Sequence, residues 1–250
     1  MSEGIRKLRD FLKNDSRKNF DFSQTDQAKG MPAPSVEKPV LAGQRVVTLP
    51  KPKEWKHVEK VDLVGAIKRR RSQRIFIKKS LLLEELSYLL WATQGVVRKG
   101  QGYTMRTVPS AGARHALETY LCVLDVESLN PGVYRYLPIE HQLVEEFLDE
   151  ELAAKIVAAC MGQQFMGTAG IVFVWAAIPY RMEWRYGPIS VKAIAMDAGH
   201  VCQNLYLACE AVSCGTCAIG AYDQEKADTL IRVDAEDEFV IYLAPVGKVS

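Results

Sequence analysis

Apolar residues repeat at intervals of three and four positions in several stretches of the chain, and each such stretch predicts an amphipathic helix. The clearest repeat runs from Asp197 to Val212. A second repeat carries leucines from Leu83 to Leu90, with Ser80 as the expected helix cap. Further helices are expected from Asp62, as N-cap, to about Arg70, from Leu152 to Met161, and from about Asp223 to Ile231.

Other stretches are rich in β-branched and aromatic residues and predict strands. The segment 171–178 is almost entirely apolar, which is typical of a strand that is buried on both faces. Strands are expected at residues 118–124, 133–137, 171–178, 216–219 and 239–243, with a short strand or turn at 143–147. Helices and strands alternate without a regular βαβ repeat, so the pattern favours an α+β fold with one sheet between helices.

The N-terminal part of the chain differs from the rest and suggests a division into an arm, residues 1–58, and a domain, residues 59–250. From Asn19 to about Trp55 the chain carries prolines and scattered glycines without a sustained apolar period. This composition predicts an extended segment that lies on another surface. Ile5, Leu8 and Phe11 have helical spacing, so a short helix is expected to dock before the arm begins.

Composition and charge narrow the class of protein. Of the 250 residues, 48% are hydrophobic and 25% charged, which excludes a disordered chain or a disulfide scaffold. The sequence contains no run of about 18 apolar residues and no secretory signal, so we expect a cytoplasmic protein without membrane attachment. Residues 1–80 hold 20 Lys and Arg against 9 Asp and Glu, a net charge of +11, whereas residues 81–250 hold 12 against 21, a net −9. This division is compatible with a nucleic-acid arm, a segment that wraps an acidic body, or a phosphate site.

The chain lacks the motifs of a catalytic site made of side chains alone. It contains no G-x-G-x-x-G, no G-x-x-x-x-G-K-[ST] and no G-x-S-x-G. Six cysteines lie in apolar surroundings, as expected for reduced core residues, and the pair Cys214 and Cys217 has no second pair to complete a zinc site. We therefore expect no metal, and an enzyme with this sequence would depend on an organic cofactor.

A cluster of basic residues follows the helix that begins at Asp62. Arg70, Arg71 and Arg74 surround the hydroxyl of Ser72. Guanidinium groups bind phosphate with two parallel hydrogen bonds, so the cluster indicates a phosphate site. The alternatives are a solvated basic face and a patch that binds nucleic acid. Basic patches that bind single-stranded nucleic acid usually contain several exposed aromatic residues, and here only one, Phe76, follows the cluster.

The sequence resembles the FMN-dependent nitroreductase family, specifically its SagB-type dehydrogenase branch, over about residues 60–247. The motifs that carry this resemblance, in order, are Arg70-Arg71-Ser72-x-Arg74-x-Phe76, Pro109-Ser110-Ala111-Gly112-Ala113-Arg114-His115, Gly132-Val133-Tyr134-Arg135-Tyr136-x-Pro138, Asp197-Ala198-Gly199-His200, Gly215-Thr216-x-Ala218-Ile219-Gly220-Ala221 and Pro245-Val246-Gly247. The resemblance implies a three-layer sandwich with a central, mainly antiparallel sheet flanked by helices. It also implies a homodimer with FMN at the interface and no nucleic-acid partner.

The same resemblance implies a set of cofactor contacts. Arg70, Arg71 and Ser72 would hold the FMN phosphate and ribityl chain, and Arg74 would face the pyrimidine edge of the flavin. The other subunit would contribute Pro109, Ser110, Ala111 and Gly112. Ile219, Gly220 and Ala221 match the place where a backbone N–H turns toward flavin N5. Gln163 would add an amide contact, with its neighbour Gln164 as the alternative, and Lys248 is the late basic residue that could reach the phosphate.

The expected reaction follows from one position at which this sequence differs from the SagB-type branch. Azoline-oxidising members carry a lysine and a tyrosine where this sequence has Arg185 and Tyr186. Because arginine hardly deprotonates, Arg185 is expected to position an anion, and Tyr186 is the candidate acid or hydrogen-bond donor. We expect an FMN-dependent oxidoreductase that passes hydride from NAD(P)H through flavin N5 to a nitroaromatic, a quinone or a similar small acceptor. The alternatives are SagB-type azoline oxidation and a low-turnover flavin subunit of a peptide-maturation complex.

Overall fold

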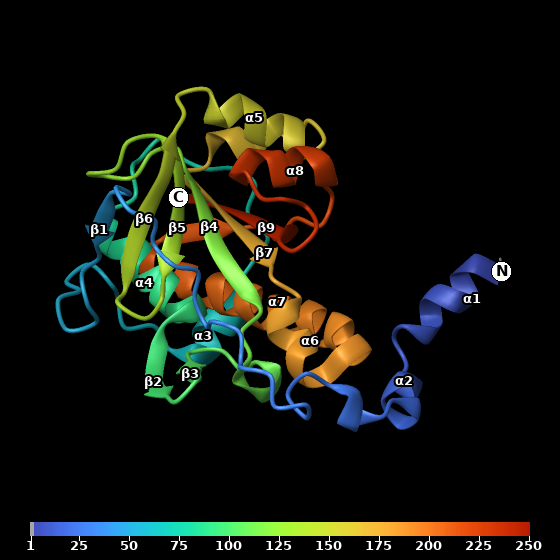
Figure 1. Ribbon diagram of the computed structural model, residues 1–250. Coiled ribbons are helices and arrows are strands. Elements are labelled where there is room, and N and C mark those ends of the chain that lie inside the picture. Colours follow the sequence, from blue (N-terminus) through green and yellow to red (C-terminus); the bar gives the residue numbers. More distant parts are fainter. Residues whose placement is uncertain (1–2) are drawn as a thin grey trace.

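The chain folds around a central sheet with helices on both sides, in a computed structural model that describes residues 3–250 (Figure 1). The helices are α1 (Glu3–Asp10), α2 (Asp15–Asn19), α3 (Leu63–Arg69), α4 (Leu83–Gln94), α5 (Leu152–Ala159), α6 (Tyr180–Tyr186), α7 (Ser190–Cys209) and α8 (Gln224–Ile231). The strands are β1 (Val46–Thr48), β2 (Val96–Gly100), β3 (Tyr103–Arg106), β4 (Leu117–Val123), β5 (Gly132–Leu137), β6 (Gln142–Leu148), β7 (Ile171–Ala177), β8 (Cys214–Thr216) and β9 (Phe239–Lys248). Seven strands form one antiparallel sheet in the order β1-β6-β5-β4-β7-β9-β8, and β2 and β3 form a separate hairpin.

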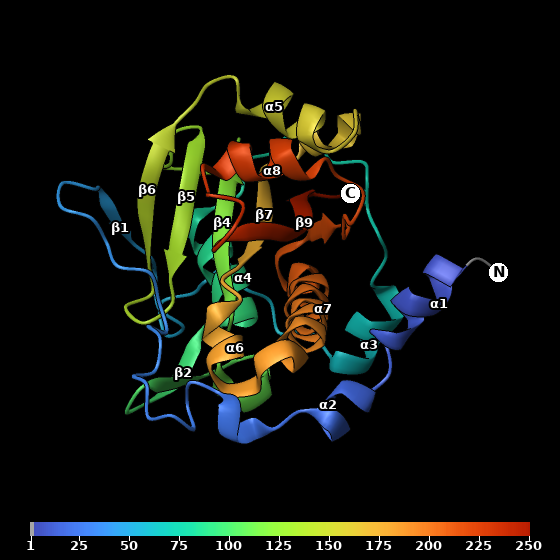
Figure 2. The same ribbon diagram turned by 45° about the vertical axis from the view of Figure 1, so that its right-hand side comes forward.

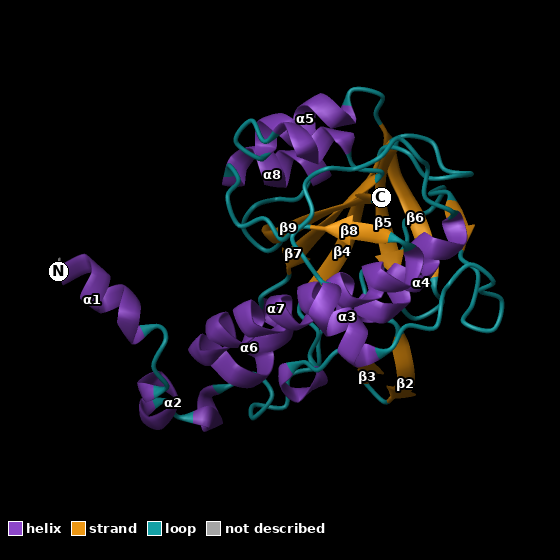
Figure 3. Ribbon diagram, turned by 180° about the vertical axis from the view of Figure 1, so that it is seen from behind, coloured by secondary structure: helices purple, strands orange, loops and turns teal. Residues whose placement is uncertain are grey.

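Both faces of the main sheet bury apolar side chains, which alternate between its two sides along each strand. In β7, Phe173 and Trp175 belong to the core shared with α4 and α7, whereas Val172 and Val174 belong to the core shared with α5 and α8. Figures 1 and 3 show these two helix pairs on opposite sides of the sheet. The expected α+β sandwich with a central antiparallel sheet is therefore confirmed.

The helix that starts after Asp62 has the predicted cap, but two other helix starts were predicted wrongly. The Asp62 carboxylate accepts a hydrogen bond of 2.7 Å from the Gly65 N–H. Ser80 does not cap α4; its hydroxyl donates to Asp125, and α4 begins after Leu82. The long helix α7 begins at Ser190 rather than at Asp197, which places Asp197 inside the helix. Helix α6 and the β2–β3 hairpin had no counterpart in the sequence prediction.

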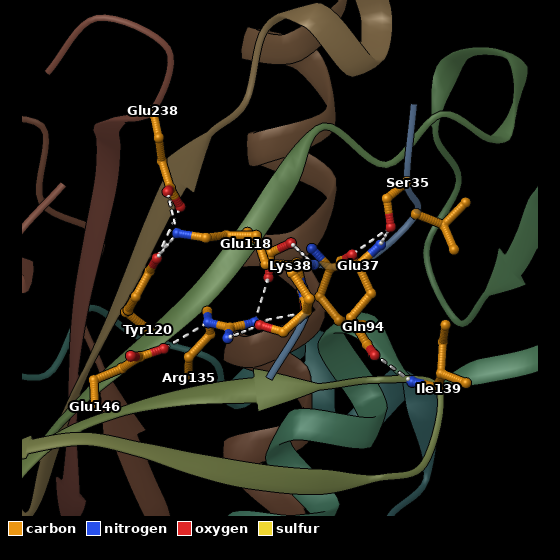
Figure 4. Close-up of polar contacts among 12 residues, drawn as sticks. Ser35, Glu37, Lys38, Gln94, Glu118, Tyr120, Arg135, Ile139, Glu146 and Glu238 are labelled. Atoms are coloured by element: carbon orange, nitrogen blue, oxygen red, sulfur yellow. Dashed lines mark hydrogen bonds and ion pairs between the residues drawn. The ribbon is translucent and has the colours of Figure 1, made fainter. Parts of the chain in front are cut away.

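The N-terminal arm lies on the sheet of its own chain. Strand β1 pairs with β6 at the sheet edge. Lys38 reaches between β4 and the loop before β9, where its ammonium donates to the Tyr120 hydroxyl at 2.8 Å and pairs with Glu238 (Figure 4). The buried Arg135 donates to the carbonyls of Lys38 and Pro39 at 3.1 and 3.0 Å. Buried polar contacts of this kind fix the path of the arm across the sheet.

The first helix, α1, extends away from the rest of the chain in Figure 1, and it overlaps α3 in the turned view of Figure 2. Leu8 and Leu12 expose 74% and 68% of their surface, so most of the apolar face that was expected to dock is open to solvent. The predicted arm begins at residue 1, and residues 1–2 lie outside the described residues. None of the helices within residues 3–250 combines the length and hydrophobicity needed to cross a membrane.

Candidate cofactor site

The basic segment after α3 lies beside β8. Ser72 forms a parallel bridge with Thr216, and the Gln73 N–H donates to the Thr216 carbonyl at 2.9 Å. The Arg70 guanidinium lies over the ring of Tyr206, 5.3 Å from its centre. Backbone pairing therefore fixes the segment, while its side chains stay at the surface.

Tyr206, a residue of α7 that the sequence analysis gave no role, joins this segment to the turn after β8. Its hydroxyl lies 2.9 Å from the Ser72 hydroxyl and accepts a hydrogen bond of 2.8 Å from the Ala218 N–H. Tyr206 lies in the apolar repeat predicted from Asp197 to Val212, but its contact with Ser72 joins residues 134 positions apart. Sequence spacing carries no signal for such a pair.

Four more of the predicted residues lie in this region. The Gln163 side-chain amide donates to the carbonyls of Ala221 at 3.0 Å and Cys160 at 2.9 Å. Arg74 lies over the ring of Phe165, 5.9 Å from its centre. Gly220, the neighbour of Ala221, is exposed. We call Arg70, Ser72, Arg74, Gln163, Tyr206, Gly220 and Ala221 the arginine group.

Three predicted cofactor residues have other surroundings. One Arg71 guanidinium nitrogen donates to the carbonyls of Lys68, Arg69 and Arg70, so Arg71 closes the end of α3. The Ile219 side chain is buried in the core. Lys248 is 5% exposed, and its ammonium pairs with Glu85 and donates to the Val212 carbonyl. Because that ammonium is buried with two partners, the predicted phosphate contact of Lys248 is not supported by its position.

A second set of predicted residues forms the loop from Pro109 to Gly112. Pro109 is exposed, and the Ser110 hydroxyl accepts a hydrogen bond of 2.9 Å from the His115 N–H. The loop lies against Asp197, which is 5% exposed and has one carboxylate oxygen without a partner among residues 3–250. Burial raises the pKa of Asp197, while hydrogen bonds from the Ser110 hydroxyl and the Ala111 N–H act in the opposite direction.

Gly112 joins this loop to the end of α6. It has a left-handed φ of +58°, and a Cβ there would lie 2.5 Å from the Tyr186 hydroxyl and 3.1 Å from the Arg185 side chain. The predicted catalytic pair therefore lies directly against the predicted loop. We call Pro109, Ser110, Ala111, Gly112, His115, Arg185, Tyr186 and Asp197 the loop group.

The two groups lie at different places along α7. Tyr206 belongs to the arginine group and Asp197 to the loop group, and they are nine positions, or about 13 Å, apart along the helix axis. One chain therefore brings the predicted residues together as two sets rather than one.

The arginine group fits a ligand with a phosphate and a flat ring. Arg69 is paired with Glu210 at 3.0 Å, whereas Arg70 and Arg74 have no carboxylate within 4 Å among residues 3–250. Both are free to bind an anion, and the Ser72 hydroxyl lies between them in the sequence. A Cβ at Gly220 would meet no atom within 4 Å, so the backbone there is open to a planar group. In the described part of the chain, no three His, Cys, Asp or Glu side chains are grouped for a metal, and all six cysteines are buried and unpaired.

Comparison with known proteins places the chain in a family. A sequence profile described as the nitroreductase family matches residues 67–248. A protein of Methanocaldococcus jannaschii described as a nitroreductase is 36% identical over 191 residues, which cover 76% of this chain and 93% of that protein. Among solved structures, a protein of Ralstonia eutropha JMP134 with the same description is 28% identical, with a TM-score of 0.68, and the match covers 88% of this chain and 95% of that one. Another, from Desulfovibrio desulfuricans and in complex with FMN, shares the fold at 15% identity, with a TM-score of 0.54 over 76% of this chain and 88% of that one. The chain belongs to the nitroreductase family.

Proposed function

We propose that this nitroreductase-family oxidoreductase binds FMN and uses NAD(P)H to reduce a small electrophilic acceptor such as a nitroaromatic or a quinone. The observation that carries the proposal is the arginine group, in which two unpaired guanidiniums and a hydroxyl lie near an open glycine turn. The FMN complex of the structurally similar Desulfovibrio protein supports the choice of cofactor. FMN supplies the hydride-accepting ring nitrogen, which side chains alone cannot provide.

Each residue of the arginine group has a separate part in this proposal. Arg70 and Ser72 bind the phosphate and ribityl oxygens, and the stacking of Arg70 on Tyr206 limits the positions of its guanidinium. Arg74 lies at the pyrimidine edge, where a permanent positive charge favours the anionic reduced ring. Gly220 and Ala221 present backbone N–H groups to the ring without a bulky side chain in the way.

The loop group reaches the cofactor through a homodimer. About 13 Å along α7 separates the two groups within one chain, so we place the loop of one chain against the arginine group of its partner. Leu63, Val64 and Ile67 of α3 each expose more than half of their surface, and Val191 and Met196 of α7 do the same. An interface over these helices would bury the apolar residues.

Arg185 and Tyr186 favour reduction over removal of a proton from a peptide azoline. A guanidinium stays charged in proteins and makes a poor base, whereas it binds anions well. Tyr186 places its hydroxyl beside Gly112, where it is available as a hydrogen-bond or proton donor to the acceptor.

The proposal is tested by the visible spectrum of the purified protein and by anaerobic titration with NADH. We expect a yellow protein with one FMN per chain, which NADH bleaches and a nitroaromatic or quinone restores. A colourless protein that does not take up added FMN would contradict the proposal. A yellow protein that NADH does not bleach would support the alternative of a low-turnover flavin subunit.

A further inference from the structure

A cavity of about 390 Å³ lies beside the loop group and has a positively charged lining. Its walls come from the arm, the tip of the β2–β3 hairpin, the segment after Ser110 and the end of α6. Arg114 and Arg185 are the charged residues of its lining, which contains no Asp or Glu within residues 3–250. We call this space the Arg114 cavity.

Arg114 is buried without a compensating charge. It is 3% exposed, and its guanidinium carbon lies 4.8 Å from the centre of the Trp184 ring. Its Nε donates to the Arg181 carbonyl at 3.0 Å, but its Nη2 has no hydrogen-bond partner in the described part of the chain. Burial lowers the pKa of Arg114, and the charges of Arg185 and Arg181 lower it further. A buried guanidinium that lacks an anion is costly, so an anion from outside the chain would stabilise it.

Two comparisons show that this excess of positive charge is particular to the Arg114 cavity. Arg181 is equally buried, yet its Nη2 pairs with Glu118 at 2.5 Å. On another side of α6 lies a cavity of about 610 Å³ whose lining includes Glu183, Glu236 and Asp237 and, among residues 3–250, no Lys, Arg or His. The helix therefore borders one cationic and one acidic cavity.

The arm holds the Arg114 cavity in shape. The Gln27 N–H donates to the Trp184 carbonyl at 2.9 Å, and the Trp184 indole N–H donates to the Met31 carbonyl at 3.0 Å. Gln27 and Ala33 form part of the wall. The ring on which Arg114 stacks is thus fixed by the arm, so the guanidinium has few alternative positions.

We propose that the Arg114 cavity binds an oxyanion, a carboxylate or phosphate group carried by a reactant of this enzyme. The inference rests on the proposed function, in which Gly112, part of the cavity wall, lies beside the flavin of the partner chain. The Arg114 guanidinium, which has an unpartnered Nη2, and the Arg185 guanidinium supply two positive charges to such a group. An acceptor with a carboxylate would be held by that group while its electrophilic end reaches the flavin.

The first experiment measures substrate preference. With FMN-loaded enzyme and NADH, kcat/KM is measured for 4-nitrobenzoate and for the neutral 4-nitrobenzyl alcohol. We expect Arg114→Met to lower the ratio of kcat/KM for 4-nitrobenzoate to kcat/KM for 4-nitrobenzyl alcohol about tenfold, because a charge-assisted hydrogen bond to the carboxylate is lost. Arg114→Lys should retain part of the preference. Arg232→Met is the matched control, because Arg232 also stacks on an aromatic ring, 3.6 Å from the centre of Phe147, but lies outside the cavity.

The second experiment does not depend on turnover. Calorimetric titration with benzoate and with phenyl phosphate measures binding whether or not the protein reduces anything, so failure of the cavity and failure of the proposed function are distinguishable. We expect both the Arg114→Met and the Arg185→Met variants to bind at least one probe about tenfold more weakly than the wild type.

The outcomes separate the source of the oxyanion. Loss of benzoate affinity together with loss of the nitrobenzoate preference assigns the cavity to the acceptor. Loss of phenyl phosphate affinity together with a lower preference for NADPH over NADH assigns it to the donor phosphate. Unchanged probe affinity in folded Arg114→Met and Arg114→Lys, or wild-type protein that binds neither probe at millimolar concentration, would overturn the proposal.

Discussion

The arginine group and the loop group are held in the structure by different kinds of contact. Arg70 and Arg74 are side chains at the surface, stacked on rings and without ion pairs in the described residues, and backbone pairing next to Thr216 fixes the segment that carries them. In the loop group, by contrast, His115 and Asp197 are buried polar residues. The first group therefore has charged side chains available for the proposed cofactor, whereas the polar residues of the second are part of the folded core.

The largest expected effect comes from removing both charges of the arginine group. In Arg70→Met combined with Arg74→Met, we expect FMN affinity to fall about 100-fold or more, because each charge-assisted contact contributes roughly 1.5–3 kcal/mol. The free energy of unfolding of the FMN-free protein should change by less than about 0.5 kcal/mol, since both side chains are at the surface. Fluorescence titration with FMN and urea unfolding measure the two quantities.

Arg69→Met is the control for this double variant. Arg69 precedes Arg70 but is paired with Glu210, so its loss removes a surface ion pair and should leave FMN affinity within about twofold. If Arg69→Met weakened FMN binding as much as the double variant, the effect would reflect general surface charge rather than two specific contacts.

A heterodimer tests whether the two groups meet across chains. One chain carries Arg70→Met with Arg74→Met, and the other carries Gly112→Val, which forces a β-branched side chain into a left-handed φ and against Tyr186. Each homodimer should have less than about 1% of wild-type activity. In a two-fold symmetric dimer, the heterodimer has one intact site of two, so tandem-tag purification should yield about half of wild-type activity. An inactive heterodimer would place both groups of a site in the same chain.

The loop group predicts a dependence of stability on pH. Burial, with further effects of Arg106 and other cations, lowers the pKa of His115 to about 3. Between pH 6.5 and 3 the unfolded chain binds a proton at this imidazole and the folded chain does not, so stability falls as the pH falls. We expect His115 to account for a loss of about 2 kcal/mol between pH 7.5 and pH 5, measured by urea unfolding at constant ionic strength.

The variant His115→Asn isolates this effect. Asparagine tolerates the left-handed φ of +46° at this position and does not titrate in this range. The difference in unfolding free energy between pH 7.5 and pH 5 should therefore shrink by about 2 kcal/mol in the variant. An unchanged difference would show that the protonation of His115 does not govern the acid sensitivity of the loop group.

The sequence predicted β4, β5, β7 and β9 because their signals are local, but it gave no strand at β1 and placed the strand at β8 two residues too late. Strand β7 is a continuous apolar run, and Asp62 is a cap within three residues of its partner. The start of α7 was missed because Val191 and Met196 leave apolar side chains exposed on the first turns, which interrupts the expected amphipathic repeat. The resemblance to a family supplied the cofactor residues, which composition and spacing alone left open.

The contacts that shape the site were beyond sequence reasoning because they join distant positions. Tyr206 meets Ser72 across 134 residues, and Arg114 meets the Arg181 carbonyl across 67. Lys248 shows the same limit: a basic residue near position 250 suggested a phosphate contact, but in the structure its buried ammonium pairs with Glu85. A local pattern specifies the type of residue, whereas the fold decides which partner it has.

The smallest expected effect concerns the hydroxyl that joins the arginine group to α7. In Tyr206→Phe the Ala218 N–H loses its acceptor and Ser72 loses its neighbour, so we expect the unfolding free energy to fall by about 1 kcal/mol and FMN affinity to fall about threefold. Tyr222→Phe is the matched control, because the Tyr222 hydroxyl also makes one backbone contact, with the Val240 carbonyl at 3.0 Å, but lies outside the arginine group. It should lose similar stability and no FMN affinity. If Tyr206→Phe lost stability but kept its FMN affinity, Tyr206 would only support α7. The position of Ser72 would then depend on its bridge to Thr216.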